Sequence, residues 1–285
     1  MGAMAFRGKF GIIADMRMKY DLVVGFGPAC SCSQTLRRAG LQLLSFPLDW
    51  LATAFKTPKW DNDVRNRAEL VASRFEGWLR KEDFIYKGPH TNGKDKYWNQ
   101  RIGMVFLHDF PQNVPLEDSF PEVAAKYKRR TSRLLDLIGK SRKVLVVRLD
   151  RPDLEYRTPD NDCRFARELL SKTFAPTKFD FLLLQRDGMV QAGNEDLEVI
   201  EPGLFRIKFD YADHRPGAEP MFPRLDLTAA AVSRFFAVRE YRTKAEIAAH
   251  RDAERRKRWA KYGATNVWQY RWRKMLGHSR GISRT

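Results

Sequence analysis

The chain alternates short apolar runs with longer segments in which apolar residues recur at helical spacing. Five runs stand out, at 22–24, 102–107, 144–149, 179–184 and 204–209. The runs in the middle of the chain are almost continuously apolar, which is typical of strands buried on both faces of a parallel sheet. Helical patterns fill most of the intervals between them. The pattern predicts a three-layer α/β domain, with a mostly parallel sheet and helices on both faces.

The remaining segments divide into expected helices and expected loops. The segments with helical spacing are 51–87, 121–141, 160–173 and 225–262. Two polar segments rich in turn residues, 87–100 and 210–223, are expected to be loops. The strand at 204–209 alternates between apolar and charged residues, so one of its faces is expected to be less buried than the other.

The chain is organised around residues 20–50, where a strand, a glycine turn and a helix start follow one another. Gly25-Phe26-Gly27 breaks the first apolar run, Pro28 is predicted to open a helix, and Gly40 is predicted to close it. Cys30 then lies in the first helical turn, where free N–H groups and the helix dipole favour a thiolate. The competing interpretation is that this cysteine is only a small apolar side chain packed in the core.

The other two cysteines are expected to pack in the core. Cys32 lies about 200° around the helix from Cys30, so the two thiols should not share a pocket. Cys163 falls on the predicted helix 160–173. Cys30 is therefore the candidate nucleophile.

His108 is the candidate general base because it ends the apolar run 102–107 and can take a thiol proton near neutral pH. A histidine satisfied by a backbone carbonyl is the alternative on pattern alone. Asp109 is a doubtful partner for it, since consecutive strand side chains point to opposite faces. Asp49 is the rival for the role of orienting carboxylate.

A second histidine follows the last predicted strand. Asp210, Asp213 and His214 lie in the loop 210–223 and could form a late acid–base pair, as in esterase-like α/β enzymes. A polar turn capped by its own side chains is the competing interpretation. His214 is kept as the alternative base.

Several motifs, in order along residues 20–190, resemble those of a known family. They are Gly25-Phe26-Gly27-Pro28-Ala29-Cys30, Leu36-Arg37-Arg38, Gly40-Leu41, Phe46-Pro47-Leu48-Asp49-Trp50, Asp95-Lys96-Tyr97, His108-Asp109-Phe110, Phe120-Pro121-Glu122-Val123, Lys126-Tyr127, Arg129-Arg130 and the run 143–148. Together they resemble a bacterial family of papain-like cysteine peptidases that was first catalogued as a domain of unknown function. Leu48 replaces the phenylalanine that is usual in that family.

The resemblance implies thiol-based acyl chemistry. Cys30 would attack a carbonyl, His108 would remove and return the proton, and Asp49 or Asp109 would orient the imidazole. Backbone N–H groups at the helix start could stabilise the oxyanion. The family label favours a peptide bond. A thiol-dependent acyltransferase or esterase in cell-surface glycan metabolism is the first alternative, and a non-enzymatic basic binding module is the second.

Composition places the chain among ordered proteins that need no disulfide framework. Its 285 residues are 43% hydrophobic, and three cysteines are an odd number, so a reducing cytoplasm is expected. No apolar run approaches the length of about 20 residues that a membrane span needs. There is no Cys-x-x-Cys, no His-Glu-x-x-His and no P-loop, so neither a metal nor a cofactor is expected.

Basic residues gather at the end of the chain. Residues 241–285 hold thirteen Lys or Arg and three Asp or Glu, which supplies +10 of the formal net charge of +17. The expected organisation is an N-terminal segment 1–19 that begins with a cloning remnant, an α/β domain 20–240, and a basic, helical C-terminal extension 241–285.

Aromatic residues alternate with the basic ones in this extension. Trp268, Tyr270 and Trp272 are interleaved with Arg271, Arg273 and Lys274. This composition suits an anionic membrane surface, which would place the protein peripherally on the inner membrane face. Nucleic acid is a possible partner by charge but has no supporting motif. Aromatic side chains packed back on the domain are the alternative.

Overall fold

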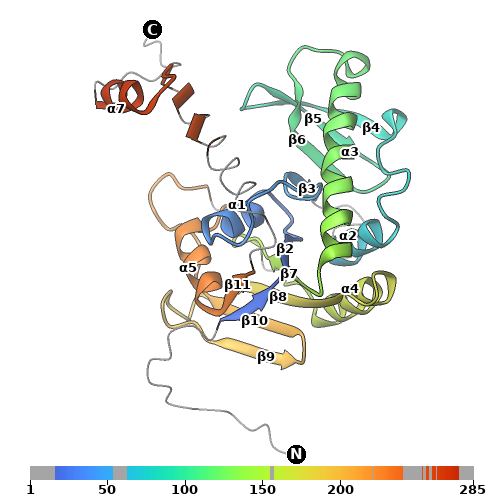
Figure 1. Cartoon of the computed structure of the whole chain (residues 1–285), viewed down its shortest axis with the longest axis vertical. Coiled ribbons are helices and arrows are strands. Elements are labelled where there is room, and N and C mark those ends of the chain that lie inside the picture. The colour runs from blue at the N-terminus through green and yellow to red at the C-terminus, as the bar shows by residue number, and fades with distance from the viewer. Residues whose placement is uncertain are drawn as a thin grey trace, which may run out of the picture. The chain divides into compact units, whose positions relative to one another are not determined.

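The computed structural model describes residues 17–53, 63–154, 157–219 and 221–239, together with 252, 255–256, 259–260 and 262–275 (Figure 1). The chain divides into two compact units, Met1–Arg239 and Glu240–Thr285. Most of the predicted N-terminal segment, residues 1–16, lies outside the described residues. Each unit is therefore described by itself.

The central sheet of the first unit has five strands in the order β2-β7-β8-β10-β9. Its strands are β2 (Leu22–Gly25), β7 (Lys143–Leu149), β8 (Lys178–Arg186), β10 (Leu204–Phe209) and β9 (Leu197–Glu201). The first four run parallel, and β9 is antiparallel to β10. Because parallel strands end at the same edge, the residues that follow β2, β7, β8 and β10 gather along one side of the sheet.

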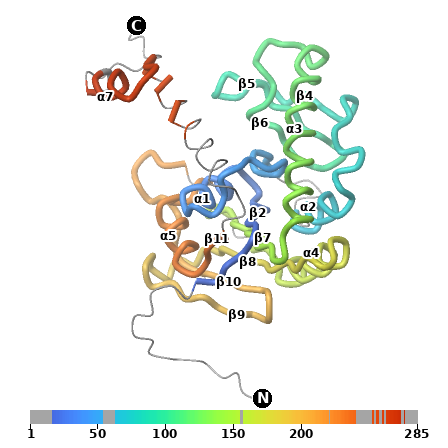
Figure 2. The backbone as a smooth tube through the Cα atoms, in the orientation of Figure 1, coloured from blue at the N-terminus to red at the C-terminus, as the bar shows by residue number. Residues whose placement is uncertain are grey.

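Helices pack on the sheet through apolar residues. α1 (Ser31–Arg38) and α5 (Leu225–Phe235) contribute Cys32, Leu36, Ala231 and Val232 to one buried cluster with the strands. α4 (Asp160–Thr173) contacts β8, and α2 (Asp63–Ala72) contacts α4. Figure 2 shows α1 and α5 beside each other, with α4 and α2 away from them across the strands.

A second sheet is antiparallel throughout, with the order β3-β6-β5-β4. Its strands are β3 (Leu51–Thr53), β6 (Met104–Pro111), β5 (Lys94–Asn99) and β4 (Phe84–His90). The helix α3 (Leu116–Lys140) packs on it: Tyr127 lies 5.2 Å from Phe106 between ring centroids. The short elements η1 (Lys81–Asp83), β1 (Met18–Tyr20) and β11 (Phe236–Val238) complete this unit, with β1 and β11 paired in parallel.

The predicted fold class is wrong: the protein is mixed α/β and not a three-layer domain built on a mostly parallel sheet. Segment 51–87 is not one helix, because it holds β3, α2, η1 and the start of β4. Segment 87–100 is not a loop but most of a hairpin. Its polar composition hides a period of two, in which Asp95, Tyr97 and Asn99 are buried and their neighbours are partly exposed.

Other elements lie close to their predicted bounds. The strands expected at 22–24, 144–149, 179–184 and 204–209 are all present in the central sheet, whereas the run 102–107 belongs to the antiparallel one. The helix predicted at 160–173 is confirmed. The helix predicted at 121–141 begins earlier, at Leu116. The helical segment predicted at 225–262 ends at Phe235 and gives way to β11, and most of its remainder lies outside the described residues.

Candidate functional site

Cys30 is the N-cap residue of α1, at the end of the turn that leaves β2. The turn needs glycine, because a side chain at Gly27 would overlap Cβ of Cys32. The backbone N–H of Thr53 donates to the carbonyl of Pro28 at 3.0 Å, which ties the turn to β3. The helix begins three residues later than Pro28 implied, and Gly40, with φ of +71°, follows its last turn as predicted.

One stripe of α1 faces away from the core. Cys30, Gln34 and Arg37, spaced i, i+4 and i+7, are partly exposed, whereas Cys32 and Leu36 are buried. Nε2 of Gln34 lies 3.5 Å from the Cys30 sulfur and donates to it. The stripe therefore presents a thiol, an amide and a guanidinium along one line of the helix.

The three thiols differ in accessibility and in pKa. Burial raises the pKa of the Cys30 thiol above its usual value, and the Gln34 amide opposes this only in part. Burial raises the pKa of Cys32 to about 12 and that of Cys163 further still. The predicted lowering of the Cys30 pKa by the helix start is thus outweighed by desolvation. Cys30 is still the most accessible of the three thiols.

Asp49 closes the turn that leads into β3. One of its carboxylate oxygens accepts from the backbone N–H of Phe46 at 2.7 Å and from Nε2 of Gln42 at 2.6 Å. Its other oxygen is buried and has no hydrogen-bond partner. Burial raises the pKa of Asp49 to about 6, although Gln42, Phe46 and the nearby Arg37 lower it. Because it does not bond to His108, Asp49 is not the orienting carboxylate of that ring.

Asp109 is also engaged elsewhere. One of its oxygens bonds to Nζ of Lys126, and the other accepts from the Tyr127 hydroxyl at 2.9 Å. These contacts hold α3 against β6 on the side of the strand away from His108, as the alternation of strand side chains predicts. Asp109 therefore has a structural role here and does not orient His108.

His108 lies beside an aromatic and a second histidine. Its ring meets Trp50 edge-on at 5.8 Å and His90 at 5.9 Å between ring centroids. Burial lowers the pKa of His108, with His90 and Lys126 acting in the same direction and Asp109 against it. The ring is thus held in its neutral form near pH 7.

Asn92 orients the His108 ring, which sequence reasoning missed. Its carboxamide nitrogen lies 2.9 Å from Nδ1 of His108 and 3.1 Å from the carbonyl of Leu107, and its oxygen accepts from the N–H of Lys94. This orientation makes Nδ1 an acceptor and leaves the proton of the neutral imidazole on Nε2. The Asn92-Gly93 pair is a hairpin-turn signal that could have placed Asn92 between β4 and β5.

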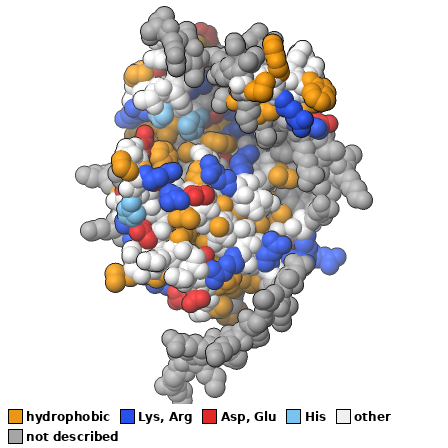
Figure 3. All heavy atoms as spheres, turned by 90° about the vertical axis from the view of Figure 1, so that its left-hand side faces the viewer, with side chains coloured by type: hydrophobic (Ala, Val, Ile, Leu, Met, Phe, Trp, Pro, Cys, Tyr) orange, Lys and Arg blue, Asp and Glu red, His pale blue; other side chains and the backbone are white. Residues whose placement is uncertain are grey.

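His214 forms its acid–base pair with Asp210. Nε2 of His214 lies 2.8 Å from its carboxylate, whereas Asp213 bonds to Arg215. His214 is 67% exposed. In the described part of the chain, neither His108 nor His214 hydrogen-bonds to the Cys30 sulfur. Figure 3 accordingly shows histidine side chains at two separate places on one face, with basic side chains between them.

A buried ionic network supports the Cys30 turn. Arg148 of β7 donates to the carbonyl of Phe26 at 2.9 Å and also bonds to Asp63 and Asp150. Arg67 bonds to Asp63 and reaches the carbonyls of the segment 48–51. Burial alone would raise the pKa of Asp63, but the two arginines lower it below its usual value. The network thus joins α2, β7 and both turns that flank the stripe of α1.

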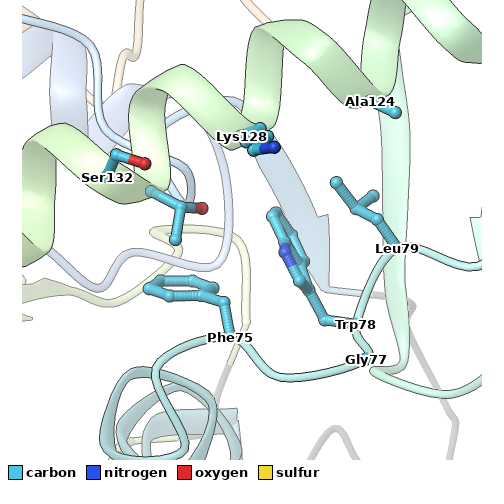
Figure 4. A pocket seen from close by; sticks show the side chains of 8 residues that line it. Phe75, Gly77, Trp78, Leu79, Ala124, Lys128 and Ser132 are labelled. Atoms are coloured by element: carbon cyan, nitrogen blue, oxygen red, sulfur yellow. The ribbon is translucent and has the colours of Figure 1, made fainter.

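A pocket of about 320 Å³ lies elsewhere on the first unit (Figure 4). Phe75, Trp78 and Leu79 line one side, and Lys128 and Ser132 of α3 line the other. Phe75 has φ of +62°, a conformation that costs energy for a residue with a side chain. No candidate catalytic residue lines this pocket, so it is separate from the surface around Cys30.

The second unit contains the helix α7 (Val267–Met275). Tyr270 packs on Tyr262 at 5.2 Å between ring centroids. Trp268, Trp272 and Met275 are 75%, 62% and 76% exposed, and their i, i+4, i+7 spacing puts them on one face. Within the described residues no helix is long and apolar enough to cross a membrane, and no three metal-ligating side chains cluster.

Comparison with known proteins gives one weak similarity. No family model matches the chain, and no solved structure matches it. An uncharacterised protein of Acanthamoeba polyphaga mimivirus, R408, is 24% identical over 146 residues, which are 45% of this chain. The chain covers 60% of the length of that viral protein. This similarity therefore gives no information about the activity of this chain.

Proposed function

We propose that the protein is a cysteine-dependent acyl enzyme, resembling papain-like cysteine peptidases, with Cys30 as its nucleophile. The observation that supports this most is the place of Cys30. It is the most accessible thiol, it begins α1, and it lies where the backbone of the turn is held by buried charges. A rigid turn that presents a nucleophile at the carboxyl edge of parallel strands suits attack on a bound carbonyl.

The reaction proceeds through a thioester. The Cys30 thiolate attacks the carbonyl carbon, a C–S bond forms, and the bond to the leaving amine, alcohol or thiol breaks as that group takes up a proton. Water then attacks the thioester, which releases a carboxylic acid and returns the proton to Cys30. An acceptor hydroxyl in place of water would make the protein an acyltransferase, and an alcohol leaving group with water as the acceptor would make it an esterase, in either case of the kind that acts on cell-surface glycans.

His108 is the group proposed to move the proton, which requires its ring to approach the Cys30 sulfur, since among the described residues no hydrogen bond joins these two. In the observed arrangement Nδ1 accepts from Asn92, so the neutral ring carries its hydrogen on Nε2 and has no lone pair there for the thiol proton. Removal of the thiol proton by Nε2 requires the other tautomer, with the hydrogen on Nδ1. The imidazolium formed in that step then protonates the leaving group. His214, paired with Asp210, is the alternative base.

The test is capture of the thioester. Incubation with p-nitrophenyl acetate should release a burst of p-nitrophenolate equal to the protein present, and mass spectrometry of a digest should find the acetyl group on Cys30. The peptides of Cys32 and Cys163 are internal controls. The Cys30→Ala variant should show no burst. Acetylation spread over lysines, with Cys30 unmodified, would reject the proposed function.

A second candidate function is supported by α7. We propose that the basic second unit binds the anionic inner face of the membrane, with Trp268 and Trp272 inserted at the interface. The exposed apolar face of the helix, with Arg271 against Trp268, is the supporting observation. Sedimentation with anionic vesicles should be strong for the full chain and weak for Trp268→Ala/Trp272→Ala. Retention of binding by this variant would reject the insertion of the tryptophans.

A further inference from the structure

Arg37 and Trp50 are held together at the far end of the exposed stripe of α1. The Arg37 guanidinium lies 5.8 Å from the centre of the Trp50 ring. Both side chains donate to the hydroxyl of Ser45, Nη2 of Arg37 at 2.8 Å and Nε1 of Trp50 at 3.4 Å. A guanidinium that lies near an aromatic ring and shares a hydrogen-bond acceptor with it is pre-organised to bind an anionic ligand.

This place is on the same surface as the proposed acyl chemistry. Trp50 contacts Arg37 on one side and the ring of His108 on another. Cys30 and Arg37 are seven residues apart on one helix face, which corresponds to about 10 Å along the axis. The thiol, the amide and the guanidinium therefore lie along one helix face, and Trp50 contacts both Arg37 and His108.

Two arginines of α3 lie close to the groups that Arg37 contacts. Arg133 of α3 donates to the carbonyl of Ser45 at 3.2 Å, and Arg130 is close enough to lower the pKa of Asp49. Asp49 lies 3.8 Å from Arg37, a distance too long for a strong ion pair. Nε of Arg37 and Nη1 of Arg130 are buried without hydrogen-bond partners. Two arginines, Arg37 and Arg130, therefore act on the single carboxylate of Asp49.

We propose that the acyl substrate carries a carboxylate, bound by Arg37 beside Trp50, about 10 Å from the carbonyl that Cys30 attacks. The inference rests on the proposed function of Cys30. A planar guanidinium with part of its surface exposed matches a carboxylate.

The competing view is that Arg37 only braces the turn at Ser45. A bracing residue would not make the thiol of Cys30 distinguish a charged reagent from a neutral one. Two alkylating probes of equal length provide that test. N-iodoacetyl-6-aminohexanoate places a carboxylate at the proposed distance from the thiol. N-hexyl iodoacetamide has an arm of the same length without the charge. N-iodoacetylglycine carries the carboxylate too close to the thiol to reach Arg37.

The rate of Cys30 alkylation, followed by mass spectrometry at low ionic strength, should be about tenfold higher with the aminohexanoate than with the hexyl probe. The glycine probe should show little of this advantage. Arg37→Gln should remove the preference, and Arg37→Lys should keep part of it. Arg38→Gln is the matched control, since it removes an exposed charge from the same helix and should leave the ratio unchanged.

Equal rates for the two long probes in the unmodified protein would overturn the inference, whatever the variants do. The inference would also be overturned if Arg38→Gln lost the preference as fully as Arg37→Gln. The preference would then come from the net charge of the helix and not from Arg37. Thermal unfolding shows whether Arg37→Gln is folded. Failure of the proposed function has a different signature: p-nitrophenyl acetate would leave no acetyl group on Cys30, even if the charge preference of alkylation were present.

Discussion

The side-chain amide of Asn92 donates to Nδ1 of His108 across 2.9 Å, and two backbone groups hold that amide in its orientation. The bond sets the tautomer of a ring that the proposed chemistry uses. Because the pKa of His108 is lowered, the ring stays neutral near pH 7, with Nε2 as its donor. In this tautomer Nε2 cannot take up the thiol proton, so the base form of the ring needs a hydrogen-bond acceptor beside Nδ1.

Asn92→Asp should supply that acceptor. A carboxylate at hydrogen-bond distance should raise the pKa of His108 by about 1 to 3 and favour the hydrogen on Nδ1. Histidine ring signals followed by NMR against pH measure both effects. Asn92→Ala is the control: it removes the hydrogen bond without adding charge, so it should release the tautomer and raise the pKa much less than the carboxylate does. An unchanged pKa in Asn92→Asp would show that Asn92 does not govern the ring.

Arg148→Met should destabilise the first unit by about 3 to 5 kcal/mol, because it leaves buried carboxylates short of a counter-charge. Arg148 and its partners Asp63 and Asp150 are each 2% exposed or less. Urea unfolding followed by circular dichroism measures the free energy of unfolding. Arg215→Met, which breaks the exposed pair with Asp213, is the control and should change little. Similar costs for the two variants would contradict the structural role of the network.

Asp49→Asn should gain stability relative to the unmodified protein as the pH rises. The pKa of Asp49 is about 6 in the folded protein against 3.8 for the ordinary side chain, so the folded state holds the proton more tightly. The contribution of Asp49 to stability is therefore lost progressively between about pH 4 and pH 6. The difference between the two proteins should grow across this window by up to about 3 kcal/mol.

Unfolding at several pH values provides the measurement. Asp83→Asn is a suitable comparison, because that carboxyl is also buried but is paired with Arg101. A stability difference for Asp49→Asn that is constant between about pH 4 and pH 6 would show that Asp49 titrates normally.

Binding of the full chain to anionic vesicles should weaken steeply with salt. Exposed charges are screened within about 8 to 10 Å at ordinary ionic strength, and each basic residue near the surface contributes about 1 kcal/mol. A chain ending at Glu240 should lose binding and keep the reactivity of Cys30. Neutral vesicles and a nucleic acid of matched charge serve as controls. Equal binding by the long and short chains, or tighter binding to the nucleic acid, would reject the membrane proposal.

Local signals in the sequence were sufficient for the Cys30 turn and for the four parallel strands of the central sheet, but not for its edge strand β9. Continuously apolar runs such as 144–149 have few alternatives to a buried strand. Gly40 marks the end of the short helix that follows the turn, although the helix begins at Ser31 and not at Pro28. The helix 160–173 was found for the same reason, since its periodicity is complete within the segment.

The second sheet and the partners of the candidate residues were decided by tertiary contacts. The polar strand 94–99 is a strand only because β4 and β6 pair with it, and no local pattern names those neighbours. Asp49 and the more doubtful Asp109 were both candidates to orient His108, yet each is bound by other groups. A buried charge takes whichever donor the fold places within about 3 Å, and that distance depends on packing between residues far apart in the sequence.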